Sequence, residues 1–117
     1  MAPDPILKAS DFESHPEGTV IFEEGQPGDR MYYVVAGAVN VLVGGRIVYV
    51  VKTGEILGEM ALIDDKPRSA TAMAATACRL IGIDRQRFVK LVQETPQFAL
   101  QVLRTMAERL RQMNVVQ

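Results

Sequence analysis

Residues 54–72 read GEILGEMALIDDKPRSATA, and this stretch passes through four kinds of local structure. Gly54 and Gly58 permit tight backbone conformations that a side chain would block. Residues 59–62 are good helix formers directly after a glycine, so they predict one short helical turn. Residues 64–67 indicate a loop. Arg68 then opens an apolar, alternating segment, which predicts a strand over residues 69–74.

The same stretch carries the residue types of an anion site. The first turn of a helix offers unpaired backbone N–H groups, which suit an anion. Arg68 adds a permanent positive charge with a forked donor geometry that matches a phosphate. Glu59 adds an acceptor for a sugar hydroxyl, as the acidic residue of a dinucleotide site does. The stretch therefore predicts a site for one phosphate and one sugar hydroxyl. Spacing alone also allows a turn closed by a solvated salt bridge between Glu59 and Arg68.

Short apolar runs alternate with glycine-bearing turns on both sides of this stretch. They predict strands over residues 19–22, 31–36, 38–43, 46–52, 69–74 and 79–84, with a hairpin turn at Gly44-Gly45. Short strands at this regular spacing are typical of an all-β sandwich or barrel. The absence of helical patterns between them argues against a parallel sheet. Residues 1–18 are expected to hold at most a turn or two of helix, followed by a turn over residues 15–18.

The apolar periodicity switches to 3.6 after Asp84, which can cap a helix over residues 85–94. Thr95-Pro96 ends that helix and starts another, from residue 97 to about 114. Its apolar residues follow heptad spacing at Ala99, Leu103, Met106, Leu110 and Met113. This seam either covers the β-domain of its own chain or pairs with the same helix of a second chain.

Residues 58–62 (GEMAL), the five loop residues after them and residues 68–71 (RSAT) resemble the phosphate-binding cassette of the cyclic nucleotide-binding domain family. This family includes the ligand modules of catabolite activator protein, cyclic-nucleotide-dependent kinases and nucleotide-gated channels. The glycine turn at residues 25–29 and the run at residues 31–37 extend the resemblance from about Gly18 to the C-terminus. The resemblance implies a mainly β fold, an eight-stranded antiparallel jelly roll (double-stranded β-helix), with helices after the last strand. Residues 1–117 would form one domain: a lead-in (1–18), a β-roll (19–84) with the cassette (54–72), and C-terminal helices (85–117).

The resemblance also implies roles for single residues. Arg68 would bind the cyclic phosphate and Glu59 the ribose 2′-hydroxyl. The rest of the phosphate and ribose site would be formed by Gly58, Met60, Ala61, Leu62, Ser69 and Ala70. In the family, threonine at the place of Ser69 often accompanies a preference for the guanine nucleotide. Serine leaves the base open, and we expect cyclic AMP rather than cyclic GMP.

The nucleotide base needs an apolar wall and a lid, for which the sequence offers several residues without choosing between them. Wall candidates are Leu57, where the cassette commonly has phenylalanine, and Ile47, Val48, Val50 and Met73. Lid candidates from the last helix are Leu110, Arg111 and Met113.

Composition limits the other classes of function. The chain has 117 residues and a formal net charge of −1, so it lacks the basic excess typical of a nucleic-acid-binding domain. Its single histidine, His15, argues against a metal-dependent enzyme of the cupin type. No nucleophile–base pair accompanies Cys78, its single cysteine. We therefore expect no enzymatic activity, no metal and no cofactor besides the ligand. No segment reaches membrane-spanning length and no signal peptide is apparent, which favours a cytoplasmic protein.

These observations predict a cyclic nucleotide sensor. Ligand would order the cassette and reposition the C-terminal helices, which would pass the signal to an unknown effector protein. The alternative is an interaction module that dimerises through the last helix without binding nucleotide. Transcription factors of the activator branch carry a helix-turn-helix after the long helix. The chain stops at Gln117, so we expect no direct DNA binding, and the initial Met1 favours a complete small protein.

Overall fold

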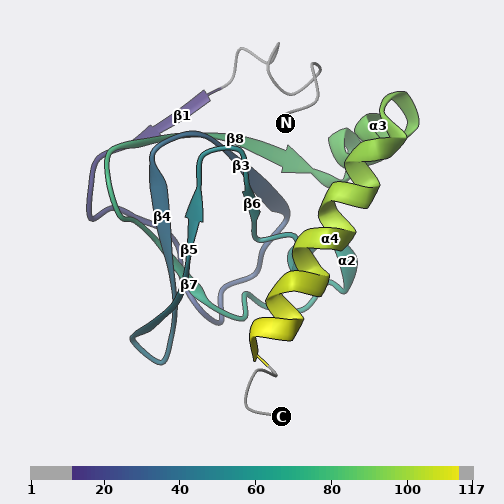
Figure 1. Ribbon diagram of the computed structural model, residues 1–117. Helices are drawn as coiled ribbons and strands as arrows, with labels where there is room; N and C mark the ends of the chain where they lie inside the picture. The colour runs from purple at the N-terminus through teal and green to yellow at the C-terminus, as the bar shows by residue number, and fades with distance from the viewer. Residues whose placement is uncertain (1–11, 114–117) are drawn as a thin grey trace.

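The computed structural model describes residues 12–113 and is drawn in Figure 1. Within this range the strands and helices follow the order β1 (Phe12–His15), β2 (Val20–Phe22), β3 (Arg30–Ala36), β4 (Ala38–Val43), β5 (Arg46–Lys52), β6 (Ile56–Leu57), α2 (Met60–Ile63), β7 (Thr71–Ala74), β8 (Cys78–Asp84), α3 (Arg85–Glu94) and α4 (Pro96–Met113).

The strands form two four-stranded sheets, with the orders β1-β8-β3-β6 and β2-β7-β4-β5. Every pairing is antiparallel. The chain crosses repeatedly from one sheet to the other, which is the connectivity of a jelly roll. The predicted fold class, a β jelly roll followed by C-terminal helices, is confirmed.

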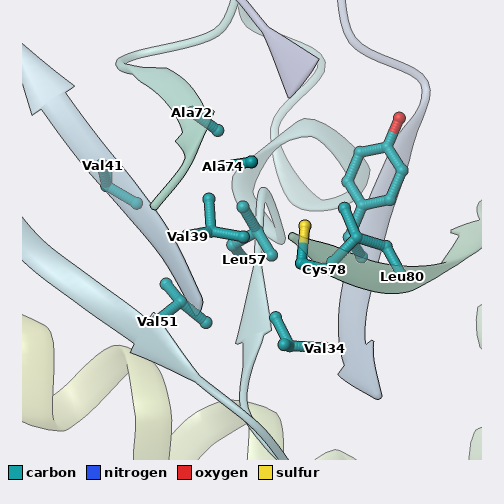
Figure 2. Packing of buried hydrophobic residues seen from close by; sticks show 10 residues of the cluster. Val34, Val39, Val41, Val51, Leu57, Ala72, Ala74, Cys78 and Leu80 are labelled. Atoms are coloured by element: carbon teal, nitrogen blue, oxygen red, sulfur yellow. The ribbon is translucent and has the colours of Figure 1, made fainter. Parts of the chain in front are cut away.

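Two apolar clusters explain why β3 is apolar along most of its length. Tyr32 and Val34 belong to a cluster between the two sheets, part of which is labelled in Figure 2. Met31 and Tyr33 point the other way, into a cluster that also contains Phe98 of α4. Successive residues of a strand face opposite sides. Because one side of β3 meets the second sheet and the other meets the helices, neither side can be polar.

The helices lie along the outer face of the first sheet, and α4 runs past α2 and β6 (Figure 1). The predicted bounds of α3 are confirmed, and the Asp84 carboxylate accepts a hydrogen bond of 2.8 Å from the Arg87 N–H. Pro96 opens α4, as its missing N–H favours. Phe98 and Val102 are buried against the sheet, so α4 covers its own β-domain with this face.

The predicted lead-in is wrong at its C-terminal end, because Phe12–His15 is a strand that pairs with β8. We expected His15 in a loop, but its ring lies on β1, 3.1 Å from the Glu13 carboxylate. This strand lies at the edge of its sheet and its residues are exposed or half-buried, so its apolar pattern is weak. The helix expected further upstream lies outside the described residues.

Smaller differences concern the other strands. The two-residue β6 was not predicted, because it is too short to show alternation. The strand predicted over 69–74 begins at Thr71, and the one predicted over 79–84 begins at Cys78. The hairpin turn is confirmed, since Gly44 and Gly45 have φ of +58° and +80°, values that favour glycine.

Candidate functional site

A small pocket opens where the stretch 54–72 meets the second sheet. Its volume is about 40 Å³, room for only a few water molecules. The stretch 54–72 contributes most of its lining, and β2, β4 and β5 contribute the rest. The lining residues are Phe22, Val41, Tyr49, Leu57, Gly58, Glu59, Met60, Ala61, Pro67, Arg68, Ser69 and Ala70.

Arg68 is a charged residue of this pocket that is only 7% exposed. Its Nη2 donates to the Arg30 carbonyl at 2.8 Å and its Nη1 to the Gly58 carbonyl at 3.2 Å. Its Nε–H is buried without a hydrogen-bond partner in the described part of the chain. No carboxylate of residues 12–113 forms an ion pair with it. Burial lowers the pKa of Arg68, because the cation loses hydration that no ion pair replaces.

The backbone around Arg68 is held on both sides by the turn between β2 and β3. The Arg68 N–H donates to the Gln26 carbonyl and the Arg68 carbonyl accepts from the Gly25 N–H, both at 2.8 Å. These two hydrogen bonds fix the position of the Arg68 backbone. The side chain can then reach the pocket from a backbone that is itself ordered.

Gly58 lies directly against the guanidinium. Its φ of +75° favours glycine, and a Cβ there would be 2.7 Å from the Nη1 of Arg68. A side chain at this position would therefore both strain the backbone and displace the arginine.

Glu59 is also buried, with an exposed fraction of 6%. Its Oε1 accepts a hydrogen bond of 2.9 Å from Nη1 of Arg109 on α4. Arg109 also donates to the Ile56 carbonyl, and its guanidinium lies 4.6 Å from the centroid of the Tyr49 ring. Thus the alternative prediction from spacing, a solvated salt bridge between Glu59 and Arg68, is wrong. Both side chains are buried, and Glu59 pairs with α4 instead.

The sequence model of one protein family, the cyclic nucleotide-binding domain, matches residues 12–95. These residues begin at β1 and end after α3. This chain belongs to the cyclic nucleotide-binding domain family.

Relatives of known name support the assignment. A CRP-like cAMP-activated global transcriptional regulator of Mycobacterium tuberculosis is 32% identical over 85% of this chain and 46% of the regulator. The crystal structure of the Thermus thermophilus catabolite activator protein matches with a TM-score of 0.78 and 31% identity, over 90% of this chain and 52% of that one. cAMP-bound PfPKA-R matches with a TM-score of 0.77 and 25% identity, over 91% of this chain and 36% of that one. This cyclic nucleotide-binding domain thus spans about half the length of the two bacterial relatives, and less of the third.

Most residues that the sequence singled out in this cyclic nucleotide-binding domain meet at the pocket. They are Leu57, Gly58, Glu59, Met60, Ala61, Arg68, Ser69 and Ala70. Leu62 does not line the pocket, because it packs into the helix-facing cluster. The N–H groups of Ala61 and Leu62 donate to Gly58 and Glu59 within the short turn, so part of the expected amide donors is engaged there.

The other wall and lid candidates lie away from the pocket. Val48 and Val50 of β5 are 52% and 40% exposed, and neither these two nor Ile47 and Met73 line the pocket. Leu110 and Arg111 are exposed on α4 and do not line it either. The side chain of Met113 lies outside the described residues.

Sequence reasoning missed four lining residues, Phe22, Val41, Tyr49 and Pro67, and it missed Arg109. One feature could have indicated Arg109. It lies 11 residues after Phe98 and seven after Val102, and helical periodicity puts all three on one face of α4. A charge on a face that is otherwise apolar needs a partner in the β-domain. In the described part of the chain, no helix combines the length and the apolar character needed to cross a bilayer.

Proposed function

We propose that this domain binds cyclic AMP, with the cyclic phosphate on Arg68 and the ribose 2′-hydroxyl on Glu59. The observation that carries the proposal is the buried Arg68 guanidinium, which no carboxylate of the described residues neutralises. Leaving a cation buried without an ion pair is costly, and a bound phosphate removes that cost. Two of the related proteins are described as cAMP-activated and cAMP-bound, which supports cyclic AMP as the nucleotide.

The pocket wall suits the remaining parts of a nucleotide. Tyr49, Val41 and Leu57 offer apolar surface beside the two charged residues. Ser69 is exposed at the pocket edge and offers one hydroxyl. A nucleotide needs a pocket of several hundred Å³, about ten times the present volume. Binding therefore requires the pocket to open, and movement of α4 is the simplest route because Arg109 closes over Glu59 and Tyr49.

The need for α4 to move would connect nucleotide binding to the signal that the domain passes on. Arg109 holds Glu59 in the structure, and the ribose hydroxyl of a bound nucleotide would compete for the same carboxylate or join the pair. Either arrangement changes the position of α4 relative to the cassette. We propose that α4 carries the signal to an effector protein. An absence of enzymatic activity, of direct nucleic-acid binding and of membrane association, and a cytoplasmic location, remain predictions from the sequence.

A second candidate function is dimerisation through α4. The expected seam included Met106, but Met106 packs on the domain's own core. Leu100, Leu103 and Leu110 are 47%, 59% and 60% exposed on this helix. A second copy of this helix would remove that apolar surface from water, as in a short coiled coil.

A thermal-shift and calorimetry screen tests the main proposal. Cyclic AMP at one hundred times its Kd should stabilise the fold by about 2.7 kcal/mol. Cyclic GMP and cyclic dinucleotides should stabilise it less at equal concentration. No shift with any cyclic nucleotide would contradict the proposal and favour an interaction module that does not bind nucleotide.

A further inference from the structure

Phe22, at the end of β2, lies against the guanidinium of Arg68. The Cζ atom of Arg68 is 4.0 Å from the centroid of the Phe22 ring. The same ring stacks with Tyr32, with centroids 6.2 Å apart and planes inclined by 21°. Tyr32 itself is part of the buried cluster between the sheets. A chain of stacked groups therefore connects the core to the charged wall of the pocket.

Backbone groups surround the rest of the Arg68 guanidinium. Its Nη atoms donate to the carbonyls of Gly58 and Arg30. A Cβ on Gly28 would lie 2.4 Å from its Nε, so residue 28 leaves space for the arginine only because it is glycine. The guanidinium lies over the ring face of Phe22, which is the aromatic side chain in contact with it.

An aromatic face differs from a carboxylate in one respect that matters here. It attracts a cation through its quadrupole but has no net charge. It also leaves the N–H groups of the guanidinium free to donate hydrogen bonds to other acceptors. Backbone carbonyls have no net charge either. Every contact given above therefore holds Arg68 in place while leaving its positive charge unneutralised.

We infer that Phe22 is a positioning residue, which holds the Arg68 guanidinium at the pocket wall through its ring face and so keeps the full charge available to the phosphate of a ligand. The inference rests on the proposed function, because the position of Arg68 affects binding only where an anion binds to it. It also makes a statement about the ligand-free protein, which can be tested separately.

Graded fluorination of the ring tests the inference with little change in shape. Fluorine withdraws electron density from the ring face, so 4-fluoro-, 3,5-difluoro- and 3,4,5-trifluorophenylalanine at position 22 should weaken cyclic AMP binding in that order. We expect a loss of roughly fivefold for the trifluoro ring, measured by calorimetry, while the urea midpoint falls by no more than the weakened cation–π contact accounts for. Equal affinity across the series would overturn the inference. An affinity loss that is equal for all three fluorinated rings, whatever their electron density, would also overturn it, because that indicates packing alone.

Phe12 provides a matched control. It also lies beside an arginine, with the Cζ atom of Arg79 5.4 Å from its ring centroid, but on β1 outside the pocket. The same fluorinated residues at position 12 should leave cyclic AMP affinity unchanged. A loss as large as that at position 22 would overturn the inference, since it would not depend on Arg68.

The ligand-free protein provides a readout that needs no nucleotide. The ring current of Phe22 should shift the buried Arg68 Nε–H resonance upfield in the NMR spectrum, and Phe22→Leu should return it toward the usual arginine position. An Arg68 resonance that Phe22→Leu leaves in place would overturn the inference even if cyclic AMP binds. A wild-type protein that binds no cyclic nucleotide would overturn the proposed function instead, and the resonance would still decide whether Phe22 holds Arg68.

Discussion

Nη1 of Arg109 lies 2.9 Å from Oε1 of Glu59, although the two residues are 50 positions apart in the chain. Their side chains are only 14% and 7% exposed, so this ion pair is largely removed from water. It connects the cassette to α4, the helix that we propose transmits the signal. The same carboxylate is our candidate for the ribose hydroxyl, so in this proposal Glu59 contacts both the ligand and the helix that carries the signal.

Breaking this pair should destabilise the ligand-free domain. Arg109→Met leaves the Glu59 carboxylate buried without its partner, and we expect the free energy of unfolding to fall by about 3 kcal/mol. Urea unfolding followed by circular dichroism measures the change. Adding Glu59→Gln should restore part of the loss, because the unpaired charge is then gone. A change below about 0.5 kcal/mol in the single variant would show that water reaches the pair freely.

Arg68→Ala should abolish tight nucleotide binding while the domain stays folded. Removing one partner of a buried charge pair costs about 2–5 kcal/mol, so we expect cyclic AMP affinity to fall by about thirtyfold or more. The domain without ligand should stay folded, because the substitution removes two hydrogen bonds to backbone carbonyls but no ion pair of the described residues. Arg79→Ala on the exposed face of β8 is the control and should bind as wild type. Unchanged affinity of Arg68→Ala in titration calorimetry would remove Arg68 from the site.

A ligand without the 2′-hydroxyl should bind more weakly than cyclic AMP. The 2′-deoxy form cannot donate to Glu59, and the loss of a hydrogen bond to a charged group corresponds to roughly a tenfold drop in affinity or more. In Glu59→Gln the difference between the two ligands should shrink, because the charged acceptor is absent. Equal affinity of wild type for both ligands would exclude Glu59 as the ribose acceptor.

If α4 pairs with a second copy, a charge in its exposed apolar face should separate the two chains. We expect Leu103→Glu to convert a dimer to a monomer in analytical ultracentrifugation, because Leu103 is 59% exposed and central in that face. Val89→Glu is the control, since Val89 is 48% exposed on α3 and lies outside the face. A wild-type protein that is monomeric at high concentration, with or without cyclic AMP, would exclude this interface.

Cys78 should make the domain less stable at alkaline pH. Burial raises the pKa of its thiol, so the folded state keeps a proton that the unfolded state releases above about pH 8.5. Its contribution is fully present below that pH and is lost as the pH rises toward the folded-state pKa. Urea unfolding at pH 7.5 and 9.5 should show a smaller decrease for Cys78→Ala than for wild type. An identical decrease would show that the thiol ionises equally in both states.

The sequence determined those features that depend on local chemistry. Glycines such as Gly44 and Gly45 mark the turns because only glycine readily adopts their positive φ. Alternation and 3.6-residue periodicity separate β3–β5 from α3 and α4. The cassette keeps Gly58, Glu59 and Arg68 close in the chain, so its residues could be named without coordinates.

Only the tertiary structure decided which distant residues complete the site. Phe22 comes from β2 and Arg109 from α4, and neither differs from an ordinary strand or helix residue until the sheets and helices pack. The edge strand β1 was missed for the same reason, since it acquires its partner β8 only in the folded chain. Local preferences act between near neighbours in the chain, whereas these contacts follow from how the buried faces of whole elements fit together. The sequence therefore specified the residues of the cassette, and packing specified that Phe22 faces Arg68 and that Arg109 closes over Glu59.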